Sequence, residues 1–278
     1  MNLLRKLPLV GMAVLSLSAG PLWAVDAPAP DTREKLAKII AGEHRSAENK
    51  ARDVYRHPLE TLLFFGLRDD MTVVEIYPST GWYTEILAPL LRAKGKYYAA
   101  GFDASSKIDF MRQSVEALNK KLALDPQRYD KVVVTELAPP QHTMIAPAGT
   151  ADLVLTFRNV HNWMKAGNAD VIFKAMHKAL KPGGILGVVE HRANPDVPQD
   201  PEANNGYVRE DYVIALAEKA GFEFVEKSEI NANPKDTKDH PRGVWTLPPT
   251  LAMGDTDKDK YLAIGESDRM TLKFRKRS

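Results

Sequence analysis

Hydrophobic and polar positions alternate along most of this chain in a pattern that predicts short buried strands separated by amphipathic helices. The run 71–77 (MTVVEIY) is rich in β-branched residues, and 80–91 has helical spacing before Gly95. The alternation continues downstream, with strands expected at 96–102, 131–135, 152–157, 185–190, 222–229 and 270–274 and helices at 108–122, 169–180 and 208–220. Short apolar strands that alternate with helices indicate a mostly parallel sheet with helices on both faces. The predicted fold class is therefore α/β, doubly wound.

The segment in front of the first predicted strand has a helical pattern. Asp31 and Glu34 form a capping box, and the apolar positions that follow predict a helix over 32–41. Two further short helices are expected before the first strand. We therefore predict a helical extension, 31–68, in front of an α/β core, 71–278, within a single domain.

The N-terminus has the pattern of a secretory signal peptide. Arg5 and Lys6 provide a positive start, and an apolar stretch follows over 7–17, with a small residue at the expected cleavage site. The apolar stretch is too short to cross a bilayer of about 30 Å. We expect 1–24 to be removed, 25–30 to form a linker, and the mature protein to be periplasmic without stable insertion in a membrane.

Composition and charge exclude several classes of protein. The 278 residues include 38 Lys and Arg, 36 Asp and Glu and no Cys, and 44% of them are hydrophobic. A chain of this size and apolar content builds one large core, and the lack of Cys excludes disulfide-stapled folds. The net charge of +2 provides no field for non-specific nucleic-acid binding. We expect a small-molecule partner and no nucleic acid, and the oligomeric state is left open.

Residues that end the predicted strands are the first candidates for function, because ligands of open parallel sheets bind outside the carboxyl ends of the strands. The first strand ends at Glu75 and continues through Ser79 and Gly81 into a helix, a turn that directs backbone N–H groups toward a ligand. Asp103 ends the second strand, where its carboxylate is placed to accept hydrogen bonds from ribose hydroxyls. An ordinary turn aspartate fits the same position equally well.

Two histidines follow strands at the same predicted edge. His161 follows the fourth strand and His191 the fifth, and both are candidate catalytic bases because histidine titrates near neutral pH. The alternative for each is a hydrogen bond to a neighbouring loop. Glu190 is expected to point to the other face of the strand from His191, so that the two side chains need not share a site.

Four segments resemble the class I S-adenosylmethionine (SAM) dependent methyltransferases, and among them the exported methyltransferase-like proteins of proteobacteria. They are VVEIYPSTG, GFDAS, ADLVLTFRNVHNW and LKPGGILGVVEHR, and the resemblance covers roughly residues 71–276. It implies a Rossmann-like fold, SAM as cofactor, and methyl transfer to a small molecule or an exposed protein group. By the same resemblance, cofactor contacts fall on Glu75, Ser79 and Gly81 for the methionine part, Asp103 for ribose, and Asn159 with His161 near the methyl group.

The first turn departs from the family's usual acid-x-Gly-x-Gly-x-Gly pattern. Tyr77 and Ser79 stand at the first two glycine positions, and Pro78 between them has no N–H to donate. A side chain at a position of close backbone approach obstructs the cofactor. Two hypotheses therefore stay open: a SAM-dependent methyltransferase, and a non-catalytic binding protein for a small molecule on a methyltransferase scaffold.

Other chemistries have weaker support in the sequence. A serine hydrolase would use Ser79, Asp152 and His191 in that order, but the first glycine of a nucleophile elbow is missing. No metal site is expected, because His57, His161, His191 and Asp152 lack the paired spacing of metal ligands.

Two segments outside the predicted strands are candidates for lining a pocket. Arg56 and His57 lie in a charged stretch that is either a solvated helix face or an anion-binding element. In the long late loop, Arg242 and Trp245 are expected to line the pocket, and the alternative for Trp245 is to anchor the loop on the core.

Overall fold

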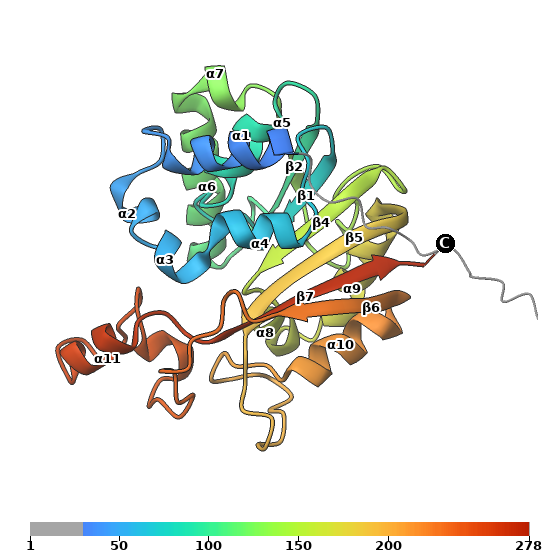
Figure 1. Cartoon of the computed structure of the whole chain (residues 1–278). Coiled ribbons are helices and arrows are strands. Elements are labelled where there is room, and N and C mark those ends of the chain that lie inside the picture. The colour runs from blue at the N-terminus through green and yellow to red at the C-terminus, as the bar shows by residue number, and fades with distance from the viewer. Residues whose placement is uncertain (1–29, 278) are drawn as a thin grey trace, which may run out of the picture.

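The computed structural model describes residues 30–277, so that the expected signal peptide, 1–24, and most of the linker lie outside the described residues. A seven-stranded sheet with the order β3-β2-β1-β4-β5-β7-β6 forms the centre of the molecule (Figure 1). Its strands are β1 (Thr72–Ile76), β2 (Lys96–Gly101), β3 (Val132–Glu136), β4 (Ala151–Phe157), β5 (Leu180–His191), β6 (Phe222–Ser228) and β7 (Arg269–Lys276).

The first five strands run parallel, and β7 lies antiparallel between β5 and β6. This confirms the predicted doubly wound, mostly parallel α/β fold. The direction of strand order reverses between β1 and β4, which are neighbours in the sheet. The carboxyl ends of β1, β4 and β5 therefore meet at the edge where open α/β sheets bind ligands.

Helices cover both faces of the sheet, and each face has its own apolar core (Figure 1). One face carries α1 (Pro30–Ala41), α4 (Pro58–Phe64), α5 (Thr84–Leu91) and α6 (Asp109–Leu124). The other carries α8 (Val160–Lys165), α9 (Ala169–Ala179) and α10 (Glu210–Lys219). Leu36, Leu62 and Ile86 are fully buried on the first face, and Phe173 and Met176 on the second.

The N-terminal segment contains α1 and three further short helices, one more than expected. Between α1 and α4 lie α2 (Ala47–Lys50) and α3 (Asp53–Arg56), and α7 (Pro126–Tyr129) follows α6. His57 adopts a left-handed conformation, with φ of 39°, between α3 and the proline that begins α4. This bend directs α3 toward the carboxyl edge of the sheet, where it contacts the segment that precedes β7.

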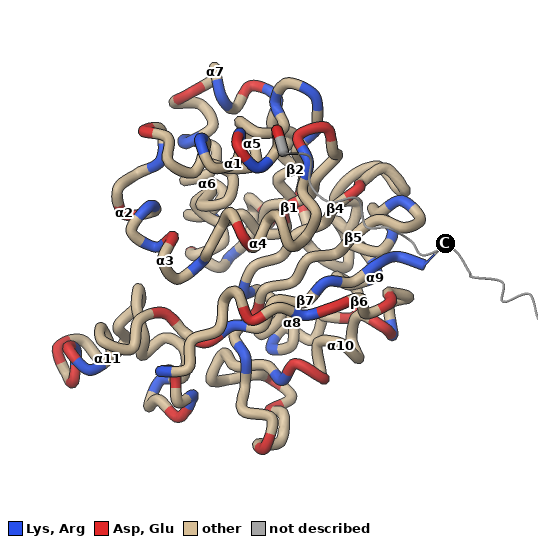
Figure 2. Tube along the Cα trace, viewed as in Figure 1, with Lys and Arg blue, Asp and Glu red and all other residues tan. Residues whose placement is uncertain are grey.

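The segment between β6 and β7 contains a 3-10 helix, η1 (Gly243–Thr246), and α11 (Lys258–Ile264), which lies away from the sheet (Figure 1). Basic and acidic residues are both scattered along the trace, and most of the trace is uncharged (Figure 2). No helix in residues 30–277 is long and apolar enough to cross a membrane.

Candidate functional site

The first turn, between β1 and α5, keeps a left-handed backbone at each position where the resembled family has glycine. The φ angles are 49° at Tyr77, 53° at Ser79 and 82° at Gly81. Only glycine adopts this region without a steric cost, which is roughly 1 to 2 kcal/mol for other residues. The backbone path of the turn is thus retained although two of its three positions carry side chains.

The side chain of Tyr77 covers the carboxyl ends of β1 and β2. Its ring stacks on Phe102, which follows β2, with centroids 4.1 Å apart and an interplanar angle of 13°. Its hydroxyl donates a hydrogen bond of 2.8 Å to the carbonyl oxygen of Leu137, which follows β3. Burial raises the pKa of Tyr77, so that the phenol stays protonated and keeps this bond. Apart from a small pocket of about 20 Å³, the space between the first turn and the end of β2 is therefore filled by protein.

The Asp103 side chain stabilises the turn that follows β2. Its Oδ1 accepts hydrogen bonds from the backbone N–H of Ser105 at 2.6 Å and from the Ser105 hydroxyl at 2.7 Å. These bonds lower the pKa of the Asp103 carboxyl. This is the geometry of an ordinary turn aspartate, which the sequence offered as the alternative to a ribose contact.

Glu75 and Asn159 are buried, and both make contacts within the protein. Tyr97 donates its hydroxyl hydrogen to Glu75 Oε2 at 2.5 Å, and burial raises the pKa of Glu75 to about 7. Asn159 Nδ2 donates to the carbonyl oxygen of Ile76 and to the hydroxyl of Thr156, both at 3.1 Å. Asn159 therefore connects the ends of β4 and β1.

A cavity of about 270 Å³ opens at the carboxyl edge, over the ends of β1, β4 and β5. Of the residues expected to form the site, Ser79 and His191 line it, and Glu75, Gly81, Asp103, Asn159 and His161 are not among its lining residues. Arg56 and Trp245 also line the cavity, whereas His57 and Arg242 are not among its lining residues. For Arg56, the sequence also left open a place on a solvated helix face. Other walls come from Asn49, Arg52, Thr80, Trp82, Arg158, Val244, Pro248, Pro249, Thr250, Ser267 and Arg269.

Arginine dominates the charge of this cavity. Arg52, Arg56, Arg158 and Arg269 line it, and no Asp or Glu is among its described lining residues. Behind them lies one carboxylate, Glu266, which accepts from Arg52 Nε at 2.5 Å, forms an ion pair with Arg269, and lies 3.7 Å from Arg56 Nε. Four guanidinium groups therefore face one carboxylate, and Arg269 with the other arginines holds the pKa of Glu266 far below its usual value despite the burial.

Two of these arginines have little compensation within the protein. Arg158 directly follows β4 with φ of 61°, and within residues 30–277 its guanidinium has neither a hydrogen-bond acceptor nor an ion-pair partner. Burial, with Arg269 nearby, lowers the pKa of Arg158 to about 10. Arg56 is 4% exposed, its Nε has no hydrogen-bond partner, and its guanidinium stacks over Trp82 at 4.5 Å from the ring centroid.

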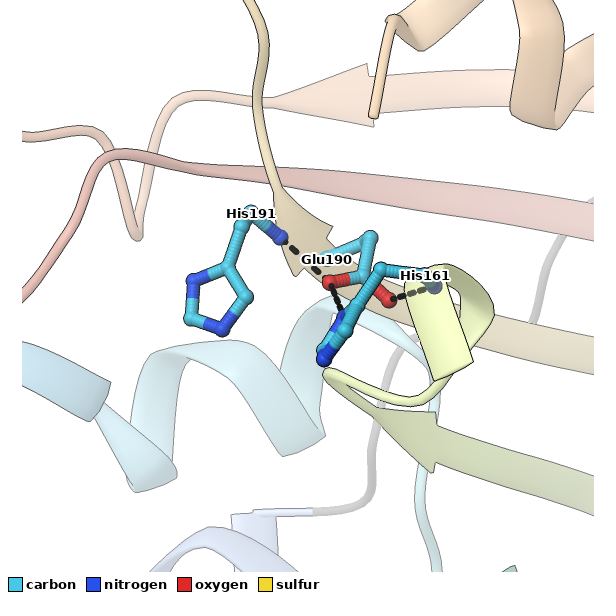
Figure 3. A group of neighbouring side chains, drawn as sticks. All are labelled: His161, Glu190 and His191. Carbon is cyan, nitrogen blue, oxygen red and sulfur yellow. Dashed lines mark hydrogen bonds and ion pairs between the residues drawn. The ribbon is translucent and has the colours of Figure 1, made fainter. Parts of the chain in front are cut away.

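His161, Glu190 and His191 form one cluster beside the cavity (Figure 3). Glu190 Oε1 lies 3.0 Å from His161 Nδ1 and accepts the backbone N–H of His191 at 2.8 Å, and Oε2 accepts the N–H of Val160 at 2.5 Å. The expectation that Glu190 need not share a site with His191 was wrong. The reason is that α8 begins directly after β4 and places its N-terminus on the Glu190 carboxylate.

His191 faces the cavity from the other side of this cluster. Its Nδ1 lies 2.5 Å from the hydroxyl oxygen of Ser267, and its ring centroid is 5.4 Å from that of His161. Burial lowers the pKa of His191 well below the usual value, and His161 and the neighbouring arginines lower it further. The imidazole is therefore neutral at neutral pH.

The serine hydrolase arrangement suggested by the sequence is not assembled. Ser79 and His191 line the same cavity, but Asp152 lies at the opposite end of β4. There its carboxylate accepts from the N–H of Thr72 at 2.8 Å and from Lys181 Nζ at 2.7 Å. For the same reason, Asp152 does not join His57, His161 and His191 in one metal site.

No family model and no curated protein matches the sequence. Among solved structures, the chain is similar to a SAM dependent methyltransferase from Aquifex aeolicus, with a TM-score of 0.51 and 20% identity over 72% of this chain and 93% of that one. It is also similar to the [4+2]-cyclase SpnF, with a TM-score of 0.54 and 15% identity over 89% of this chain and 93% of that one. One fold thus carries two reactions in these proteins. This structural similarity shows that the chain has the Rossmann-like class I methyltransferase fold.

Proposed function

We propose that this protein binds a small anionic molecule in the arginine-lined cavity, on a methyltransferase scaffold. The observation that carries the proposal is the set of Arg52, Arg56, Arg158 and Arg269 around one cavity. Within residues 30–277, three of these arginines share the carboxylate of Glu266, and Arg158 has no ion pair. The formal excess is three positive charges.

A bound anion reduces the electrostatic repulsion between the cavity arginines, which Glu266 alone does not balance. Two like charges about 4 Å apart repel by roughly 4 kcal/mol at the effective dielectric constant near a protein surface. A phosphate or carboxylate group relieves this repulsion and accepts paired hydrogen bonds from guanidinium forks. The unpartnered guanidinium of Arg158 and the unpartnered Nε of Arg56 both offer such donors.

The described residues do not fit SAM in the position that the resemblance implies. The nucleoside would lie between the first turn and Asp103, where Tyr77 stacks on Phe102. The sulfonium of SAM is positively charged, and the adjacent cavity already carries an excess of positive charge.

SAM-dependent methyl transfer is the second candidate function, and one observation favours it. The backbone at Tyr77, Ser79 and Gly81 keeps the left-handed conformation throughout the turn. Binding of SAM there requires the Tyr77 ring to leave Phe102 and to give up its hydrogen bond to Leu137. The nucleoside-binding part of such a site would then be restored.

We place this function in the periplasm. The support is the positive start and apolar stretch within residues 1–24, together with a chain that contains no Cys. Export in an enterobacterial host, followed by N-terminal sequencing of the periplasmic fraction, tests this placement.

Calorimetric titration of the purified protein with inorganic phosphate, SAM and S-adenosylhomocysteine distinguishes the two functions. We expect phosphate to bind, and Arg158→Gln to weaken its binding at least tenfold without loss of a side-chain hydrogen bond or ion pair within residues 30–277. The matched control is Arg92→Gln, which removes an exposed arginine paired with Asp130 far from the cavity. Micromolar binding of SAM with no heat from phosphate would reverse the order of the two candidates.

A further inference from the structure

Ser267 and His191 form a close pair on the wall of the arginine-lined cavity. Both residues line it, and the Ser267 hydroxyl oxygen lies 2.5 Å from His191 Nδ1. Ser267 is only 4% exposed, so the cavity is its route to a ligand. A hydroxyl within hydrogen-bond distance of a neutral imidazole is the arrangement that activates a serine nucleophile.

The residues on either side of Ser267 hold its backbone in place. Glu266 is bound by Arg52, which directly precedes α3, and by Arg269 of β7. Asp268 accepts two hydrogen bonds of 2.9 Å from Arg192 and lies 2.8 Å from Lys238 Nζ. Two carboxylates anchored on opposite sides leave the intervening serine little freedom, which is what a nucleophile requires of its support.

His191 is held as firmly as Ser267. Its backbone N–H donates to Glu190, and its ring packs between His161 and Tyr207, at centroid distances of 5.4 Å and 6.5 Å. Glu190 in turn is fixed by the N-terminus of α8. The imidazole therefore presents Nδ1 to Ser267 in one orientation.

We propose that Ser267 is a nucleophile, with His191 as its base, toward the phosphorus of a small phosphate monoester held by the cavity arginines. This rests on the proposed anion binding and adds a reaction to it. Arg56, Arg158 and Arg269 lie around the same cavity and are placed to stabilise the charge on the transferring phosphoryl oxygens.

The reaction balances without a further reactant except water. The Ser267 Oγ–P bond forms while the ester P–O bond breaks, the hydroxyl proton passes to His191 Nδ1, and the leaving alkoxide takes it to become an alcohol. Water then attacks phosphorus, gives a proton to His191, and displaces Ser267 Oγ, which recovers that proton as inorganic phosphate leaves. The negative charge of the bound ester offsets the positive charge that His191 acquires among the arginines.

A fluorophosphonate probe tests the nucleophile, because attack by Ser267 forms an Oγ–P bond and expels fluoride. We expect peptide mapping to find the label on Ser267, Ser267→Ala to abolish it, and His191→Gln to slow labelling at least tenfold. Ser114→Ala is the matched control, because Ser114 is also 4% exposed but lies in α6, where its hydroxyl donates to the carbonyl oxygen of Phe110, and it is not among the lining residues of the cavity. We also expect wild-type protein to hydrolyse p-nitrophenyl phosphate and Ser267→Ala to lose at least 90% of that activity.

A second measurement is independent of the stability of Ser267→Ala. The chain has no Cys, so Ser267→Cys introduces a single thiol. We expect iodoacetate to alkylate Cys at this position at least tenfold faster than in the double variant that also carries His191→Gln.

An unlabelled Ser267, labelling confined to another serine, equal alkylation rates in the two Cys variants, or no hydrolysis by the wild-type protein would each overturn the nucleophile proposal. These outcomes leave phosphate binding intact if only the reaction is wrong. Loss of the proposed function itself is recognised separately, by the absence of phosphate binding in calorimetry.

Discussion

The ring of Tyr77 lies flat against the ring of Phe102, with centroids 4.1 Å apart. These two residues directly follow β1 and β2, the strands whose ends would hold a nucleoside in the resembled family. The first turn therefore keeps the backbone conformation expected of a cofactor-binding turn, but the stacked rings occupy most of the space in which a nucleoside would bind. The cavity that remains lies farther along the sheet edge, toward β4 and β5.

We predict that Tyr77→Gly opens the nucleoside space. Glycine tolerates the φ of 49° at this position and removes the ring, so binding of S-adenosylhomocysteine should strengthen at least tenfold in calorimetry. Tyr77→Phe is the control, because it keeps the stack on Phe102 and loses only the hydrogen bond to Leu137. Equal binding by both variants would show that the ring is not what excludes the nucleoside.

Glu266→Gln should destabilise the fold and increase the thermal stabilisation that bound phosphate provides. The substitution removes the carboxylate shared by Arg52, Arg56 and Arg269, and breaking such a buried pair costs about 3 kcal/mol. Bound phosphate supplies the missing negative charge, so the rise in Tm on addition of phosphate should be larger than for the wild-type protein.

The comparison for Glu266→Gln is Asp130→Asn, which breaks an exposed pair with Arg92. That change should lower the free energy of unfolding by less than about 1 kcal/mol and leave the response to phosphate unchanged. Denaturant unfolding with and without phosphate measures both quantities. If the two variants respond alike, Glu266 does not balance the cavity arginines.

Glu75 should make the protein less stable as the pH rises. Its pKa is raised from 4.5 to about 7 in the folded state, so its stabilising contribution is complete below pH 4.5 and is lost as the pH rises through 7. The shift corresponds to about 3 kcal/mol. Glu75→Gln stays neutral and still accepts from Tyr97, so its free energy of unfolding relative to the wild-type protein should increase by about that amount between pH 4 and pH 8. Parallel pH profiles would contradict the raised pKa.

The fold followed from local pattern, whereas most of the site did not. Alternating apolar strands and amphipathic helices indicated the parallel sheet, and residues that end strands, such as Ser79 and His191, do line the cavity. Arg269 and Ser267 were missed because they reach the site only through the antiparallel insertion of β7 between β5 and β6. Nothing local in the sequence indicates that long-range pairing.

Arg158 carried a signal that sequence reasoning left unused. It directly follows β4, in the same segment as Asn159 and His161, and so satisfies the strand-end criterion. The family resemblance directed attention to Asn159, which proves to be a buried link between β4 and β1. A charged residue at a strand end was therefore the better indicator of the cavity than the position matched to the family.

The cluster of His161, Glu190 and His191 should be a structural and positioning element that does not bind zinc. Both oxygens of Glu190 already accept N–H groups, at 2.5 Å from Val160 and 2.8 Å from His191, and the nearby arginines repel a divalent cation. We expect Tm to be the same with zinc and with EDTA.

Glu190→Gln should lower the free energy of unfolding by about 2 kcal/mol, because the amide places a donor against one of these N–H groups. The same variant should slow labelling of Ser267, since Glu190 holds His191 in place. Glu223→Gln, which changes an exposed acid of β6, should change neither quantity. A rise of several degrees in Tm with zinc, lost in Glu190→Gln, would instead identify the cluster as a metal site.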